Sequence, residues 1–281
     1  MNNVIYLGDF GLMKKQRALA SARELLETEN LDNHPDFLLV EPENGVLRVE
    51  QVAKITEHLS YHVINASCKV VVITDMHKAT EEFQNAILKH LEDGSERCTF
   101  LLTTETPLLD TIHSRCVVQK CARWDTERME EWVQTSGLER DEVALALAGG
   151  RPGVYSSLFA EQNAFLKEMR TFVKSLNEKG CLEALRSLGA FCETSFCETH
   201  TAEQMSLLME FLQGIFLQMF YHQMESDAKT FGFVKNNEFS VTLLIPIVER
   251  CMNERRLMEK KGRYGKQEFY NFCRYLYSVA S

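Results

Sequence analysis

The sequence predicts an α/β fold that is followed by an all-α region. Up to about residue 122, short β-branched or apolar runs alternate with helical patterns, which indicates β-α-β units and a mostly parallel sheet. After that point strand-like runs nearly disappear, and helical patterns continue to the end of the chain. The two halves are therefore expected to form different domains.

Five short runs are expected to form the strands of the sheet. Residues 69–74 form an apolar run of the kind found in strands that are buried on both faces, and residues 98–105 follow the same pattern. The first run is rich in β-branched and aromatic residues and stops at Gly8. In chain order the strands are expected at residues 3–8, 36–42, 69–74, 98–105 and 116–120.

Helical periodicity fills the gaps between these strands, at residues 14–27, 48–62 and 80–93. Residues 123–160 show short helical patterns, and residues 161–281 show longer ones. One of these, residues 205–224, is apolar nearly all round, as in a helix inside a bundle. Three parts are therefore predicted, at residues 1–122, 123–160 and 161–281.

Composition narrows the functional classes. The chain has 281 residues, enough for two or three domains, and its net charge of −9 disfavours autonomous binding to nucleic acid. The basic stretch at residues 250–266 is expected to be a solvated helix face and loop.

No apolar run is long enough for a membrane span, and the N-terminus does not resemble a signal peptide, so a cytoplasmic protein is expected. The nine cysteines include no C-x-x-C pair, so we expect reduced thiols and no zinc site.

The turn between the first strand and the first helix is where a phosphate-binding loop, G-x-x-x-x-G-K-S/T, would lie. The chain has GDFGLMKK there, which keeps Gly8, Gly11 and Lys14. Met13 stands where the second glycine belongs, and Lys15 replaces the hydroxyl residue that holds Mg²⁺. A Cβ at Met13 disfavours the positive-φ turn that wraps a phosphate. We therefore expect a degenerate P-loop, with neither ATP nor Mg²⁺ bound.

A nucleotide site also needs an acidic pair after a buried strand, to hold Mg²⁺ and orient water. Here the strand is followed by Thr74 and Asp75, so the metal-binding carboxylate is missing. Thr103 and Thr104 follow the next strand, at the position of a nucleotide sensor, and are predicted to be inactive as well. Together with the loop, this predicts a chain that does not hydrolyse ATP.

Arg115 stands between Ser114 and Cys116, after a polar loop that leaves a buried strand. Two interpretations are open. The guanidinium forms a local ion pair with an acid such as Asp110, or it acts on a group outside this chain. Because a guanidinium can meet a phosphate with two parallel hydrogen bonds, the second interpretation has a definite chemistry.

Four stretches, in this order and spacing, resemble the delta-prime family of bacterial DNA polymerase III clamp-loader subunits. They are HPDFLLVEP, RVEQVAKITEHLS, KVVVITDMHKATEEFQNAILKHLED and TFLLTTETPLLDTIHSRC, and AGGRPGVYSSLF is similar to the stretch that follows in that family. The resemblance covers about residues 1–160, and the Ser-Arg-Cys triplet is its most specific element. It implies a truncated AAA+ parallel-sheet core, a small helical lid and a C-terminal helical collar domain.

The resemblance also implies a function. It points to an ATP-inert subunit of the ring that loads the sliding clamp onto primer-template DNA during replication, with the gamma/tau ATPase subunits and the delta subunit as partners. By resemblance, Arg115 is an arginine finger supplied in trans to a neighbour's nucleotide, with Ser114 and Cys116 beside it. Residues 27–37 contain no cysteine, so the zinc module of many family members is not expected. Two alternatives stay open: an AAA+ ATPase that hydrolyses ATP itself, and a free-standing adaptor of the same fold.

Overall fold

The computed structural model describes residues 3–93, 98–159, 164–180, 183–184, 202–223, 241–261, 271–272, 274–275 and 278. The chain divides into two units. The first is Met1–Trp124 with Arg151–Gly153, and the second is Asp125–Gly150 with Val154–Ser281.

The first unit is built on a five-stranded sheet with the strand order β2-β3-β4-β1-β5, in which every pairing is parallel. The strands are β1 (Asn3–Leu7), β2 (Phe37–Val40), β3 (Lys69–Ile73), β4 (Cys98–Thr104) and β5 (Cys116–Lys120). β3 and β4 are buried along their whole lengths, because they lie inside the sheet and helices cover both faces. The predicted α/β core is confirmed.

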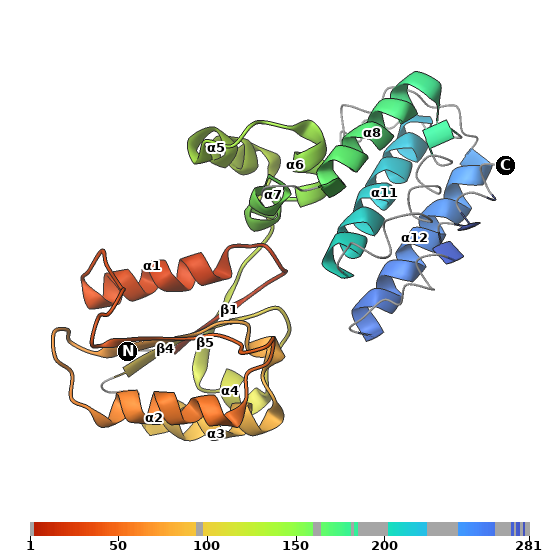
Figure 1. Ribbon diagram of the computed structural model, residues 1–281. Helices are drawn as coiled ribbons and strands as arrows, with labels where there is room; N and C mark the ends of the chain where they lie inside the picture. The colour runs from red at the N-terminus through yellow and green to blue at the C-terminus, as the bar shows by residue number, and fades with distance from the viewer. Residues whose placement is uncertain are drawn as a thin grey trace. The chain divides into compact units, whose positions relative to one another are not determined.

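Helices cover the sheet on both sides. α1 (Lys14–Leu26) lies on one face, and α2 (Val52–Ser60) and α3 (Glu81–Asp93) lie on the other (Figure 1). Side chains of β3 alternate between the two cores: Val70 and Val72 pack on the α1 side, and Val71 and Ile73 pack on the α2 and α3 side. Because all strands of the sheet are parallel, the carboxyl ends of β1, β3 and β4 meet at one edge of the sheet. This is the edge where open α/β folds bind ligands.

Three short helical turns lie in segments that were expected to be loop or regular helix. They are η1 (Val49–Gln51), η2 (Met76–Lys78) and α4 (Asp110–His113). Turns of three or four residues show no periodicity, so the sequence does not predict them. α4 is the functionally relevant one, because it ends directly before the Ser-Arg-Cys triplet.

Beyond Trp124 the described residues are helical, as predicted from the loss of strand-like runs. The helices are α5 (Thr126–Ser136), α6 (Glu142–Ala148), α7 (Pro152–Leu158), α8 (Ala164–Lys179), α11 (Ala202–Gln223) and α12 (Val241–Lys261). α11 packs against α12, and Leu208, Leu212 and Phe216 are fully buried. Of the helices in the described ranges, none is long and apolar enough to cross a membrane. In the basic stretch, Arg250 pairs with Glu254 at 2.5 Å, and residues 262–266 lie outside the described part.

Candidate functional site

The turn after β1 keeps positive-φ residues although its sequence departs from a phosphate loop. Gly11 has a φ of 77° and Met13 a φ of 54°. The Cβ of Met13 is expected to disfavour such a turn, yet Met13 adopts the left-handed conformation directly ahead of α1. That conformation costs roughly 1–2 kcal/mol for a residue with a side chain. Other contacts must hold the loop in place.

Lys14 supplies the first of these contacts. Its Nζ donates to the carbonyl oxygens of Gly8 at 2.8 Å and Asp9 at 2.6 Å, and the residue is only 6% exposed. Burial lowers the pKa of Lys14, while nearby acids such as Glu105 act in the opposite direction. The ammonium that would reach phosphates in an active loop is therefore used by carbonyls of its own loop.

Glu105 adds an acidic group beside this lysine. Burial raises the pKa of Glu105, and the charge of Lys14 lowers it. The Oε2 atom of Glu105 lies 3.8 Å from Nε2 of His77. No pattern in the sequence singles out Glu105, although it directly follows Thr103 and Thr104. The charge of the loop lysine therefore already interacts with an acid of the chain itself.

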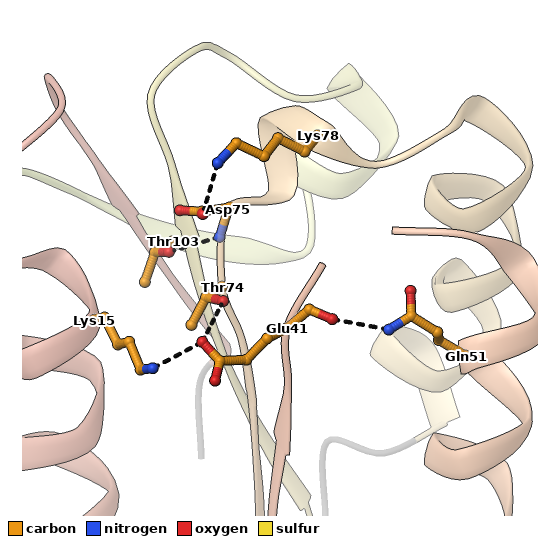
Figure 2. A network of polar contacts seen from close by, with 7 residues as sticks. All are labelled: Lys15, Glu41, Gln51, Thr74, Asp75, Lys78 and Thr103. Atoms are coloured by element: carbon orange, nitrogen blue, oxygen red, sulfur yellow. Dashed lines mark hydrogen bonds and ion pairs between the residues drawn. The ribbon is translucent and has the colours of Figure 1, made fainter. Parts of the chain in front are cut away.

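Figure 2 shows a network around Glu41, which follows β2. Nζ of Lys15 lies 2.7 Å from Oε1 of Glu41, and the Thr74 hydroxyl donates to the same oxygen at 3.5 Å. The Gln51 side chain donates to the Glu41 carbonyl oxygen at 2.8 Å. The two positions that would hold Mg²⁺ in an active site, Lys15 and Thr74, are thus turned toward a carboxylate of the chain itself.

Asp75 is held in the same region by its neighbours (Figure 2). Its backbone N–H donates to the Thr103 hydroxyl at 3.0 Å, and its Oδ2 pairs with Nζ of Lys78 at 3.0 Å. The Thr104 hydroxyl donates to the Thr106 carbonyl oxygen at 2.7 Å. The residues that the sequence singled out at the carboxyl edge do lie together. Their polar groups are bonded to other side chains of this region or to nearby backbone. With no carboxylate at Thr74, they do not fit a magnesium–nucleotide complex.

Residues 151–153 also contact the loop, within the first unit. The Gly153 N–H donates to the Gly11 carbonyl oxygen at 2.8 Å. A Cβ on Gly153 would lie 2.9 Å from that oxygen and 3.2 Å from Gly11 Cα, so this close approach requires glycine. The Gly11 carbonyl is therefore also satisfied by the chain's own backbone.

Arg115 lies directly before β5, at the edge of the sheet that the amino ends of the strands form. The loop after β1 lies at the other edge, formed by the carboxyl ends. Its Nη1 donates to the Thr111 carbonyl oxygen at 2.7 Å and to the Ser114 hydroxyl at 3.0 Å. Its Nη2 forms an ion pair with Oε1 of Glu92 on α3. The side chain stays 33% exposed. The acid that contacts Arg115 is therefore Glu92 and not Asp110, the partner suggested by the sequence.

Asn3 joins the backbones that carry Arg115 and Glu92. Its Nδ2 donates to the carbonyl oxygens of Leu91 at 3.3 Å and Arg115 at 3.4 Å, and its Oδ1 accepts from Phe100 N–H at 3.0 Å. Asn3 is only 4% exposed. Asn3 was not among the residues predicted from the sequence. The available signal was a polar amide at the start of an otherwise apolar strand.

The other two members of the triplet have local roles. The Ser114 hydroxyl donates to the Thr111 carbonyl oxygen at 3.0 Å and accepts from Arg115. Burial raises the pKa of the Cys116 thiol to about 12, although the charge of Arg115 opposes this shift. Cys116 therefore stays a neutral thiol at neutral pH. In the described part of the chain, no group of three or more His, Cys, Asp or Glu residues is placed to hold a metal ion.

Comparison with known proteins relates part of the chain to a family of replication proteins. Residues 14–124 match the family model described as "DNA polymerase III, delta subunit". The chain is 34% identical over 148 residues to the DNA polymerase III subunit delta' of Haemophilus influenzae, covering 50% of this chain and 45% of that protein. It is 34% identical over 137 residues to the same subunit of Escherichia coli, covering 46% of this chain and 41% of that protein. The resemblance to the delta-prime family is confirmed, and the matches span less than half of these relatives.

One solved structure is similar to this chain in fold. It is the crystal structure of a DNA polymerase III gamma subunit-related protein from Thermotoga maritima, with a TM-score of 0.52 and 19% sequence identity. The comparison covers 100% of this chain and 95% of that one. At this identity the likeness concerns the fold alone, and it agrees with a parallel α/β core followed by helices.

Proposed function

We propose that this chain is a delta-prime-like subunit of a bacterial DNA polymerase III clamp loader, which supplies Arg115 in trans to nucleotide bound by a neighbouring subunit. The observation that supports this most is the position of Arg115. β5 (Cys116–Lys120) separates it from the chain's own degenerate loop, and at about 3.3 Å per residue this is roughly 16 Å. Because Arg115 cannot serve that loop, any phosphate that it contacts belongs to another molecule.

Arg115 keeps the donors that a phosphate needs. A guanidinium has five N–H groups, and the described contacts use three of them. The other two are left on a side chain that is partly exposed. In phosphoryl transfer, negative charge develops on the oxygens of the transferred group. A guanidinium supplied by a neighbouring subunit stabilises that charge and raises the rate of hydrolysis by ~10³-fold or more.

The proposal assigns no ATPase activity to the chain itself. Lys14 is bound by loop carbonyls, Lys15 and Thr74 face Glu41, and Glu105 adds an acidic group beside the loop. An ATPase that uses this loop would have to break these contacts before it could hold Mg-ATP. The alternative of an enzyme acting in cis is therefore disfavoured.

Isothermal titration of the chain with Mg-ATP is expected to show no saturable binding in the micromolar range. The physical reason is that Lys14, Lys15 and Thr74, which stand where side chains would contact the phosphates or the metal, already have partners within the chain. A gamma-type ATPase subunit titrated under the same conditions serves as the positive control. A micromolar Kd for this chain would contradict the proposed role of the loop contacts.

The proposal divides the chain into three domains. Residues 1–122 form the core, residues 123–160 form the lid, and residues 161–281 form the collar through which the ring assembles. The partners are the gamma/tau ATPase subunits and the delta subunit in the cytoplasm, and through them the sliding clamp and primer-template DNA.

Sedimentation velocity tests the proposal against a free-standing adaptor. The chain is mixed at micromolar concentration with the gamma/tau-type ATPase and delta subunits of its own organism. We expect one complex that contains all three kinds of subunit. A chain that sediments alone while its partners associate would favour the adaptor.

A further inference from the structure

We propose that Glu92 is a positioning residue for Arg115, which holds the guanidinium so that its two remaining N–H groups face the neighbour's nucleotide. The inference rests on the proposed function of Arg115 in trans. It assigns a role to a residue of α3 that neither belongs to the Ser-Arg-Cys triplet nor lies near it in the sequence.

The contacts of Arg115 divide into local and distant ones. Thr111 and Ser114 are neighbours in sequence, and both take hydrogen bonds from Nη1. Glu92 comes from α3, 23 positions earlier, and takes the contact from Nη2. The local contacts hold one nitrogen of the guanidinium. The contact with Glu92 holds a second, and two fixed nitrogens set the orientation of the guanidinium plane.

Asn3 makes this arrangement rigid. Its buried amide binds the carbonyl oxygen of Leu91, the residue before Glu92, and also that of Arg115. The two backbones are therefore held together by one side chain that is also bonded to β4 through Phe100. A charge that is oriented before it meets the reacting group needs no reorganisation during the reaction, which is the basis of electrostatic preorganisation.

Glu92 is an anion, so it would compete with a phosphate if both needed the same N–H groups. The contacts favour positioning over competition, because Glu92 uses one N–H and two others remain. The carboxylate is also half exposed, which weakens its electrostatic hold on the guanidinium. A phosphate can therefore bind Arg115 while Glu92 stays in place.

The test is the steady-state ATPase of the reconstituted loader with clamp and primer-template DNA, measured as kcat and KM for ATP. The variants are Glu92→Ala, Glu92→Gln, Arg115→Ala and the double variant Glu92→Ala/Arg115→Ala. The matched control is Glu82→Gln, an exposed acid on the same helix for which the described contacts give no ion pair. The other ATP sites of the ring are inactivated, so that the rate reports the site that Arg115 serves.

We expect Glu92→Ala to lower kcat about tenfold with KM changed less than twofold, because small misplacements of a catalytic group are costly. Glu92→Gln keeps an oxygen that accepts a hydrogen bond, so its loss is expected to be smaller, about threefold. In the Arg115→Ala background, Glu92→Ala is expected to have no further effect, since the residue that it positions is gone. The Glu82→Gln loader is expected to match wild type.

The outcomes separate this inference from the proposed function. If Arg115→Ala slows the loader and Glu92→Ala does not, the inference is wrong and the function of Arg115 stands. If Glu92→Ala speeds turnover, Glu92 is a competitor and the inference is wrong. A further loss in the double variant would show that Glu92 acts apart from Arg115, which also overturns it. If Arg115→Ala has no effect, the proposed function and the inference fall together.

Discussion

Replacing Arg115 by alanine is expected to lower the clamp- and DNA-stimulated ATPase of the assembled loader by about 10³-fold at the site that Arg115 serves. The chain's own loop lies at the other edge of the sheet, so the loss would arise at a neighbour's nucleotide. Total turnover would fall less if the other sites act independently. Single-turnover hydrolysis with the other sites inactivated measures the affected step directly.

The same substitution is expected to change the free energy of unfolding of the chain by less than about 1 kcal/mol, since it removes a partly exposed ion pair with side chains 33% and 50% exposed. Arg48→Ala is the matched control, because Arg48 is an exposed arginine of the same unit. An Arg115→Ala chain that unfolds several degrees earlier while the loader keeps its ATPase would identify Arg115 as a local structural residue.

Gly8→Ala is expected to lower the free energy of unfolding of the chain by roughly 3 kcal/mol. A Cβ on Gly8 would lie 2.9 Å from Cys121 Cβ and 3.0 Å from Leu12 Cδ1, and closer still to the Cys121 carbonyl oxygen. Cys121 cannot easily move away, because its N–H donates to the Leu7 carbonyl oxygen at 2.7 Å. Chemical denaturation of the two chains measures the difference.

Gly45→Ala is the control for this substitution. Gly45 has a φ of +78°, but a Cβ there would have no heavy atom within 4 Å, so only the backbone conformation is strained. We expect a cost of about 1 kcal/mol for Gly45→Ala. Equal stability of the Gly8→Ala and wild-type chains would mean that Gly8 is not needed for strand packing and that its place in the loop requires another explanation.

The strands could be predicted from the sequence because buried strands leave continuous apolar runs. β3 and β4 show this best, since neither strand contains an exposed residue. α4 was not predicted, because a helix of four residues has no periodicity to detect. The positive φ of Met13 could not be predicted, because a side chain disfavours this conformation and only contacts elsewhere in the fold can offset its cost.

Arg115 could be singled out from its sequence context, whereas the residues that hold it could not. Glu92 precedes it by 23 positions and Asn3 by 112 positions. Both act through tertiary contacts that bring α3, β1 and the start of β5 together, and no local pattern marks such residues. The contacts of Glu41 with Lys15 and Thr74 were hidden for the same reason, because they join residues 26 and 33 positions apart.

The central claim is that this chain joins the clamp loader and acts on a nucleotide that is not its own. The most direct measurement is ATP turnover by loaders reconstituted with wild-type chain or with Arg115→Lys, at equal incorporation by sedimentation. The lysine keeps the charge but cannot form the two-pronged phosphate contact of a guanidinium. We expect both chains to be incorporated equally, and the loader with Arg115→Lys to turn over ATP more slowly than the loader with the wild-type chain. Wild-type turnover with Arg115→Lys, or failure of the wild-type chain to sediment with its partners, would contradict the account.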